Sequence, residues 1–188
     1  MKKTTELRRS FVAAAEAVGA RVTDCKNLQH AINYLSEQVD GPILCPSFAS
    51  AQRVGLEEKL RNAGLTVITG DFRTHAPTAK SGITGVNFAL ADTGSLALDS
   101  TNEEIRLATT LPEIQFALLD PQKILADSLE AVDPLRQLHR NNPRNFIAYI
   151  TGPSRTADIE RVLTIGVHGP KQLHILLVPN LSSDFLEM

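Results

Sequence analysis

The stretch NFIAYITGPSRTADIERVLTIGVHGPKQLHILLV, residues 145–178, decides the fold class. It predicts an apolar strand at 145–150, a polar turn at 151–156, a helix at about 157–163 and a second apolar strand at 173–178. Two strands joined through a helix by short loops are typical of parallel strands with a crossover helix. The stretch therefore indicates an α/β fold.

Segments of the same two kinds alternate through the rest of the 188 residues. Helices are expected at 4–19, 27–39, from Ser47 or Ser50 to about 62–64, at 102–110 and from Pro121 to about 139, and strands at 20–24, 42–46, 65–69, 96–98 and 114–119. This order predicts a single α/β domain over residues 1–188, with a mostly parallel sheet and helices on both faces. A helical segment occupies about 4–39. In such sheets, ligands bind beyond the carboxyl ends of the strands.

The composition argues against partners that need strong charge or long apolar segments. Lys and Arg total 19, Asp and Glu total 21, and there is no Trp, so the chain has neither the basic field nor the aromatic surface that nucleic-acid binding needs. No stretch approaches the roughly 18 apolar residues of a membrane-spanning helix. We therefore expect no nucleic-acid partner, no membrane partner and a cytoplasmic location.

The chain contains two cysteines, Cys25 and Cys45. They form no disulfide framework, which favours a reducing compartment. Iron–sulfur clusters are normally held by more thiolates than this chain has. We therefore expect no cofactor in this chain.

The turn at 151–156 is the first candidate site. Its possible ligand-binding residues are Thr151, Gly152, Ser154, Arg155 and Thr156. The start of a helix presents free N–H groups, and the arginine adds a forked cationic donor, so the turn can hold a phosphate or a carboxylate. The alternative is an ordinary helix cap with Arg155 paired to Asp158 or Glu160. A serine hydrolase is not indicated, because Thr156 stands where the Gly-x-Ser-x-Gly pattern needs a glycine.

A second candidate is the polar bend Asp92-Thr93-Gly94-Ser95. Such a loop can expose the Asp92 carboxylate as a catalytic base, nucleophile or hydrogen-bond acceptor, with the other three residues binding a ligand. The alternative is a turn in which Asp92 bonds its own backbone.

His168, between glycines near the last strand, is a third candidate for contact with a ligand. No metal site is expected, because Pro170 separates His168 from His174 and no third ligand is close in the sequence. We expect the bend at 92–95, the turn at 151–156 and His168 to share one cleft at the carboxyl ends of the strands.

Two of these segments resemble a known family. The residues Gly82-Ile83-Thr84-Gly85 through 91–95, and TGPSRTADIERVLTIGVHGPKQLHILLV at 151–178, are similar to the lactate-utilization (LUD) domain family, in particular its lactate utilization protein C (YkgG-like) type. The motif region covers 82–178. The family often has Glu where this chain has Asp92, and Thr where it has Ser95, so the carboxylate here reaches less far.

The resemblance implies a fold similar to the sugar-phosphate isomerase and CoA-transferase group. It also implies a role in oxidising L-lactate to pyruvate together with iron–sulfur protein subunits. Because this chain has too few cysteines for a cluster, the clusters are expected on partner chains. The chain would then be a non-cluster subunit that binds a small anion or a partner subunit and is not active alone. The alternative is a stand-alone acyl- or CoA-transferase-like or phosphosugar-binding enzyme that uses Asp92 as nucleophile.

Overall fold

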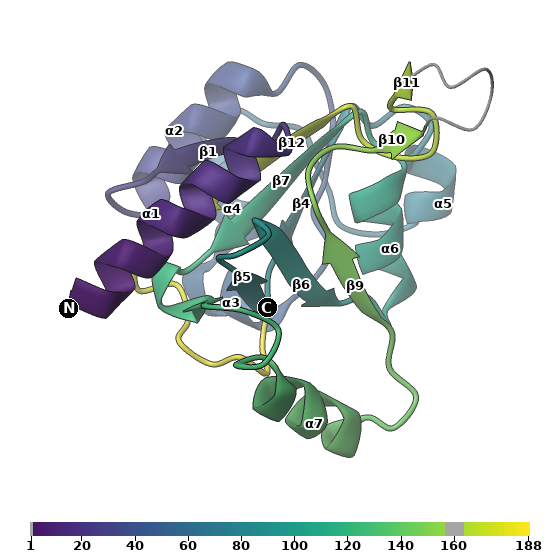
Figure 1. The fold of residues 1–188 in the computed structure, drawn as a ribbon. Coiled ribbons are helices and arrows are strands. Elements are labelled where there is room, and N and C mark those ends of the chain that lie inside the picture. Colours follow the sequence, from purple (N-terminus) through teal and green to yellow (C-terminus); the bar gives the residue numbers. More distant parts are fainter. Residues whose placement is uncertain (1, 157–163) are drawn as a thin grey trace.

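A computed structural model describes residues 2–156 and 164–188 (Figure 1). The helices are α1 (Lys2–Ala17), α2 (Leu28–Gln38), α3 (Ala49–Val54), α4 (Leu56–Asn62), α5 (Phe72–His75), α6 (Glu103–Thr110) and α7 (Val132–Asn141), with a 3₁₀ turn η1 (Pro121–Lys123). The strands are β1 (Arg21–Asp24), β2 (Ile43–Leu44), β3 (Val67–Ile68), β4 (Ser81–Gly85), β5 (Phe88–Leu90), β6 (Ser95–Asp99), β7 (Ile114–Leu119), β8 (Ile124–Leu125), β9 (Ile147–Ile150), β10 (Arg155–Thr156), β11 (Thr164–Ile165) and β12 (Gln172–Leu177). The predicted helix at about 157–163 lies outside the described residues.

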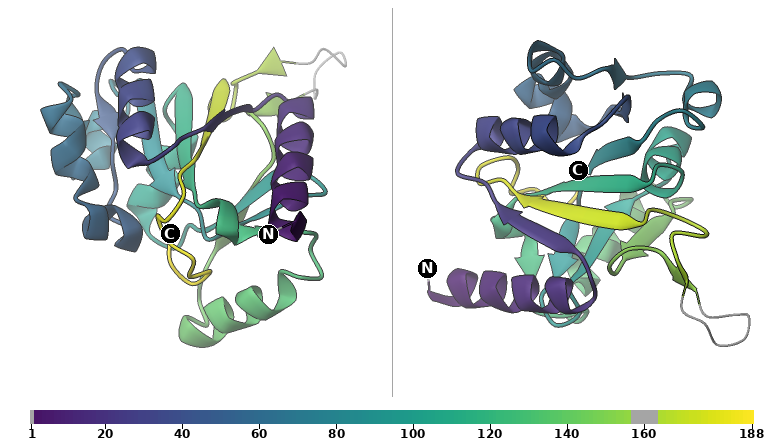
Figure 2. Two further views of the ribbon diagram at one scale, coloured as in Figure 1. Left: turned by 90° about the vertical axis from the view of Figure 1, so that its left-hand side faces the viewer. Right: turned by 90° about the horizontal axis from the view of Figure 1, so that it is seen from above.

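The main sheet confirms the predicted α/β class. Its strand order is β1-β12-β7-β4-β2-β3, and every pairing is parallel. Successive residues of β7 pack on opposite faces, as the strand period requires. Phe116 joins the cluster that contains α2 and α4, whereas Ala117 joins the cluster that contains α1. Helices therefore cover both faces (Figure 2).

A second sheet was not predicted. Its order is β8-β5-β6-β9, and β6 pairs antiparallel with both β5 and β9. Ala89 and Leu96 of this sheet pack with Ala117 and Leu119 of the main sheet, on the face that also holds α1. The strand expected at 145–150 is β9, and it belongs to this second sheet because Ile150 pairs with Leu96 of β6.

The prediction of one helix from Pro121 to about 139 was wrong. Asp120 accepts a hydrogen bond from the Gln122 backbone N–H at 2.9 Å and closes only the short turn η1. Ile124 and Leu125 then pair with β5, so the chain is extended before α7 begins. Proline at the first position suits a 3₁₀ turn as well as an α-helix, and the apolar spacing did not separate the two.

The N-terminus of α2 is capped as predicted. The Asn27 side chain accepts a hydrogen bond from the backbone N–H of His30 at 2.9 Å. In the segments 2–156 and 164–188, we find no helix with the length and apolar content to span a bilayer.

Candidate functional site

The two polar bends meet through their hydroxyl groups. Ser95 begins β6 next to the Leu96–Ile150 pair, and Thr151 directly follows β9. The Ser95 Oγ donates to Thr93 Oγ1 at 2.8 Å and lies 2.8 Å from Thr151 Oγ1. Antiparallel pairing of β6 with β9 therefore joins two segments that are far apart in the sequence.

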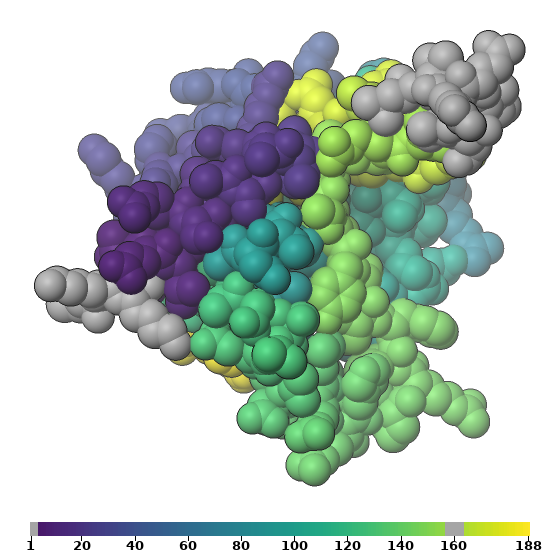
Figure 3. Space-filling view, in the orientation of Figure 1, coloured from purple at the N-terminus to yellow at the C-terminus, as the bar shows by residue number. Residues whose placement is uncertain are grey.

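Both bends turn at glycines that lie against the end of α1. Gly94 has φ +67°, and a Cβ there would lie 2.3 Å from the Ala15 backbone nitrogen. Gly152 has φ +72°, and a Cβ there would lie 2.3 Å from the Val18 carbonyl oxygen. Figure 3 shows the teal hairpin between α1 in purple and the light-green β9 segment. Glycine is needed here for the turn and for the close helix approach.

Arg155 also contacts the end of α1. Its Nη2 donates to the Val18 carbonyl oxygen at 2.7 Å. A cation at a helix C-terminus is stabilised by the helix dipole. Asp158 and Glu160 lie outside the described residues, so ligand contact by Arg155 and its pairing with either acid stay predictions.

A cavity of about 390 Å³ lies beside the turn at 151–154. We call it the Gln115 pocket. Its lining residues are Thr109, Thr110, Gln115, Ala148, Tyr149, Ile150, Thr151, Gly152, Pro153, Ser154, His168, Gly169, Pro170 and Leu173. Four predicted ligand-binding residues thus surround one cavity: Thr151, Gly152, Ser154 and His168.

The Gln115 pocket lies at the amino ends of β7 and β12, and no residue of the bend at 92–95 lines it. The expectation that this bend, the turn at 151–156 and His168 share one cleft at the carboxyl ends was therefore wrong. Gln115 and Leu173 are the second residues of these two strands. The turn at 151–154 reaches this edge because it follows β9, which belongs to the second sheet and runs antiparallel to β6.

Gln115 is the lining residue that the sequence analysis missed. The residue is 2% exposed, and its Nε2 has no hydrogen-bond partner among residues 2–156 and 164–188. A buried donor without a partner costs about 1–3 kcal/mol, and an acceptor in the cavity would remove that cost. The only signal in the sequence is a polar residue inside the apolar run 114–119.

The rest of the lining combines polar and apolar residues, and none of those described is acidic. Ser154 is fixed by its backbone N–H, which donates to the Pro170 carbonyl at 2.9 Å. His168 is exposed at the rim. Burial raises the pKa of Tyr149 above its ordinary value, so its phenol stays protonated at neutral pH. Together with Gln115, these groups offer hydrogen-bond donors to a small anion.

The other predicted residues lie outside this lining. Asp92 and Thr93 are exposed at the tip of the β5–β6 hairpin, and Gly94 is buried under α1. Thr156 pairs with Thr164 in β10 and β11. The roles of these residues in binding stay predictions.

Histidines and acids are dispersed. His174 bonds Tyr34 of α2 at 2.9 Å through Nδ1, and burial lowers its pKa to about 4. Among the described residues, no three His, Cys, Asp or Glu side chains are grouped so as to hold a metal ion.

Comparisons with known proteins place the chain in a family. Residues 8–178 match the family model of the LUD domain. The chain is 33% identical over 160 residues to lactate utilization protein C of Bacillus subtilis, a match that covers 77% of this chain and 67% of that protein. It is 31% identical over 112 residues to lactate utilization protein B of the same organism, covering 57% of this chain and 22% of that protein. The matched stretches thus leave part of each relative uncovered.

A solved structure of a DUF162 family protein from Deinococcus radiodurans has the same fold. Its TM-score is 0.69 at 16% identity, and the alignment covers 93% of this chain and 98% of that chain. The resemblance seen in the sequence is confirmed by the match over most of the chain. The chain belongs to the LUD domain family.

Proposed function

We propose that this chain is a non-cluster component of a lactate-utilization system and binds a small carboxylate or phosphate anion in the Gln115 pocket. The observation that carries the binding proposal is the buried Gln115 amide without a partner among the described residues. The system is suggested by the relatives, whose names are lactate utilization proteins B and C.

The pocket suits a small anion in size and charge. Its volume of about 390 Å³ is in the range of small-molecule sites. The lining given above contains no Asp or Glu among the described residues, so a bound anion meets no like charge there. Ser154, His168 and Gln115 supply hydroxyl, ring and amide donors to its oxygens.

The cysteines do not fit an iron–sulfur cluster. Burial raises the pKa of Cys25 to about 11 and that of Cys45 to about 12, so both thiols stay protonated at neutral pH. The whole chain has only these two thiols. We therefore assign the clusters to partner chains, and oxidation of lactate by this chain alone would contradict the proposal.

The acyl-transfer or phosphosugar alternative needs Asp92 next to the bound anion. Asp92 lies instead at the exposed hairpin tip, where its backbone N–H donates to the Ala126 carbonyl at 3.1 Å. The geometry favours binding over nucleophilic chemistry at Asp92.

We expect Gln115→Leu to weaken anion binding at least about tenfold, because leucine keeps the shape of the pocket and removes the amide donor. Isothermal titration of L-lactate and of inorganic phosphate into wild type and variant measures this and tells which anion binds. Gln29→Leu, on the exposed side of α2, is the matched control and should bind like wild type. Equal affinities of all three proteins, or no saturable binding to wild type, would contradict the proposal.

A further inference from the structure

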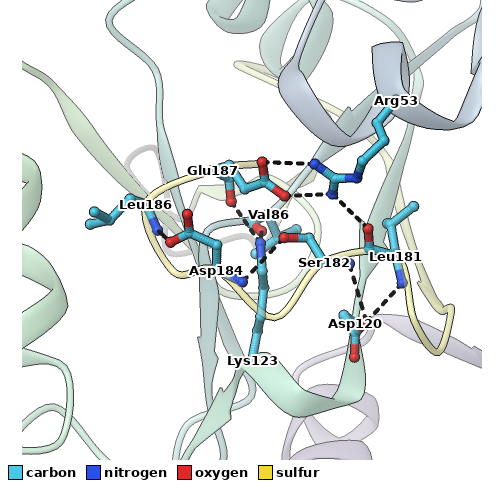
Figure 4. Close-up of polar contacts among 9 residues, drawn as sticks. All are labelled: Arg53, Val86, Asp120, Lys123, Leu181, Ser182, Asp184, Leu186 and Glu187. Carbon is cyan, nitrogen blue, oxygen red and sulfur yellow. Dashed lines mark hydrogen bonds and ion pairs between the residues drawn. The ribbon is translucent and has the colours of Figure 1, made fainter.

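The carboxyl ends of the main sheet form a second polar centre, which is covered by residues 181–188 (Figure 4). We call these residues the C-terminal segment. Asp120, which directly follows β7, accepts hydrogen bonds from the backbone N–H groups of Leu181 at 2.8 Å and Ser182 at 3.2 Å. Asn87 donates to the Phe185 carbonyl at 3.1 Å. Both side chains are almost fully buried, so buried groups of the sheet hold this segment by its backbone.

Two cations converge on Glu187 of this segment. Arg53 donates to both carboxylate oxygens, from Nη1 to Oε2 at 3.0 Å and from Nη2 to Oε1 at 2.5 Å. Lys123 Nζ donates to the main-chain oxygen of the same residue at 2.6 Å and to that of Val86 at 3.3 Å. The arginine lowers the pKa of Glu187 to about 2, so the carboxylate is ionised throughout the neutral range.

The C-terminal segment crosses a cleft. On one side lies a cavity of about 470 Å³ lined by Arg53 and Asp120, and on the other a cavity of about 600 Å³ lined by Phe48 and Asn87. Glu187 lines both cavities, so it stands between them. Parallel α/β sheets bind ligands in crevices at this end of their strands.

Among the described residues, Lys123 has no hydrogen bond to a carboxylate, although Glu187, Asp184 and Asp120 are near enough to raise its pKa. The residue is 1% exposed, and its two hydrogen bonds go to neutral carbonyl groups. Burial outweighs these carboxylates and lowers the pKa of Lys123 to about 8. A buried ammonium group is better stabilised by a hydrogen-bonded carboxylate than by carbonyl dipoles.

We propose that Arg53 and Lys123 form a binding site for a small dicarboxylate, which Glu187 of the chain itself occupies. Glu187 gives a carboxylate to Arg53 and an oxygen to Lys123, and its own Cα, Cβ and Cγ atoms separate the two groups. Glutarate carries two carboxylates at the same separation. One replaces the Glu187 side chain on Arg53, and the other gives Lys123 an anionic partner.

The C-terminal segment is then an internal competitor. Because it is tethered beside the site, its effective concentration is high, and a free ligand must displace it to bind. Weakening the hold of Glu187 on Arg53 should therefore raise the affinity for the free ligand.

Titration of glutarate into the full chain tests this competition. We expect Glu187→Ala to bind glutarate at least about tenfold more tightly than wild type does, because Arg53 loses its carboxylate partner and keeps its hydrogen bond to the Leu181 carbonyl. Glu103→Ala, which releases the exposed Arg73 from a similar pair, is the matched control and should bind glutarate like wild type. In wild type, saturating glutarate should speed amide hydrogen exchange in residues 181–188.

Glu187→Gln keeps the side-chain shape and covers the case in which the alanine variant fails to fold. Adding Arg53→Gln to it should abolish the gain in affinity. No saturable binding to either Glu187 variant, or one common affinity in wild type and all variants, would overturn the proposal. Binding of L-lactate and phosphate at the Gln115 pocket is measured separately with Gln115→Leu, so failure here and failure of the proposed function are separate results.

Discussion

Gly94→Ala is expected to lower the free energy of unfolding by about 2–5 kcal/mol. About 1–2 kcal/mol comes from placing a Cβ in the left-handed region, since φ is +67°. About 1–3 kcal/mol more comes from overpacking, because the new Cβ would lie 2.3 Å from the Ala15 nitrogen and 2.6 Å from the Ala14 carbonyl carbon. These are backbone atoms, so relief requires α1 to move away from the hairpin.

Gly64→Ala separates the two contributions. Gly64 has φ +87°, and a Cβ there would meet nothing within 4 Å. Its replacement should cost only the conformational part, about 1–2 kcal/mol. Urea unfolding of wild type and both variants measures the difference. If the two variants lost equal stability, the contact of α1 with the hairpin would not be the reason for glycine at position 94.

The main sheet could be predicted because the apolar pattern of each of its central strands is recognisable within the segment itself. The segments 114–119 and 173–178 are short and apolar apart from Gln115 and His174, and both became central parallel strands. The second sheet could not be predicted in this way. The segment 145–150 read correctly as a strand, but its partner β6 is distant in the sequence, and local pattern does not identify a distant partner.

Candidate site residues stood out in the sequence where polar or flexible residue types are clustered, and their roles in binding stay predictions. Clusters of Gly, Ser and Thr marked both polar bends, and four of the ten residues singled out surround one cavity. Gln115 and Lys123 were missed because burial decides their importance. In sequence, Lys123 lies between Gln122 and Ile124 and resembles a surface residue, whereas in the fold residues 181–188 cover it.

Lys123 should contribute a rise in the stability of the protein with pH. Burial lowers the pKa of this amine to about 8, from an ordinary value of 10.5 for an exposed lysine. Between these pH values the unfolded chain binds more protons than the folded one, so the free energy of unfolding increases as pH rises. The increase is about 3 kcal/mol, and below about pH 8 the cost of burying the charged amine is present in full.

Lys123→Met should remove this rise, because methionine does not titrate. Urea unfolding of wild type and variant from about pH 7.5 to about pH 10.5 provides the comparison. The buried thiols act in the opposite direction, because the raised pKa values of Cys25 and Cys45 lower stability above about pH 9. Both proteins contain these thiols, so the difference between the two curves isolates the lysine.

Lys59→Met is the matched control for a lysine that donates to a backbone carbonyl. Lys59 is exposed and donates to the Val54 oxygen at 2.8 Å. Lys59→Met retains Lys123, so the contribution of Lys123 to the pH dependence of stability should be retained as well. A wild-type curve parallel to that of Lys123→Met would mean that the Lys123 amine is hydrated in the folded protein. The C-terminal segment would then leave the cleft open to water. Glu187 would not compete effectively with a free dicarboxylate for Arg53 and Lys123.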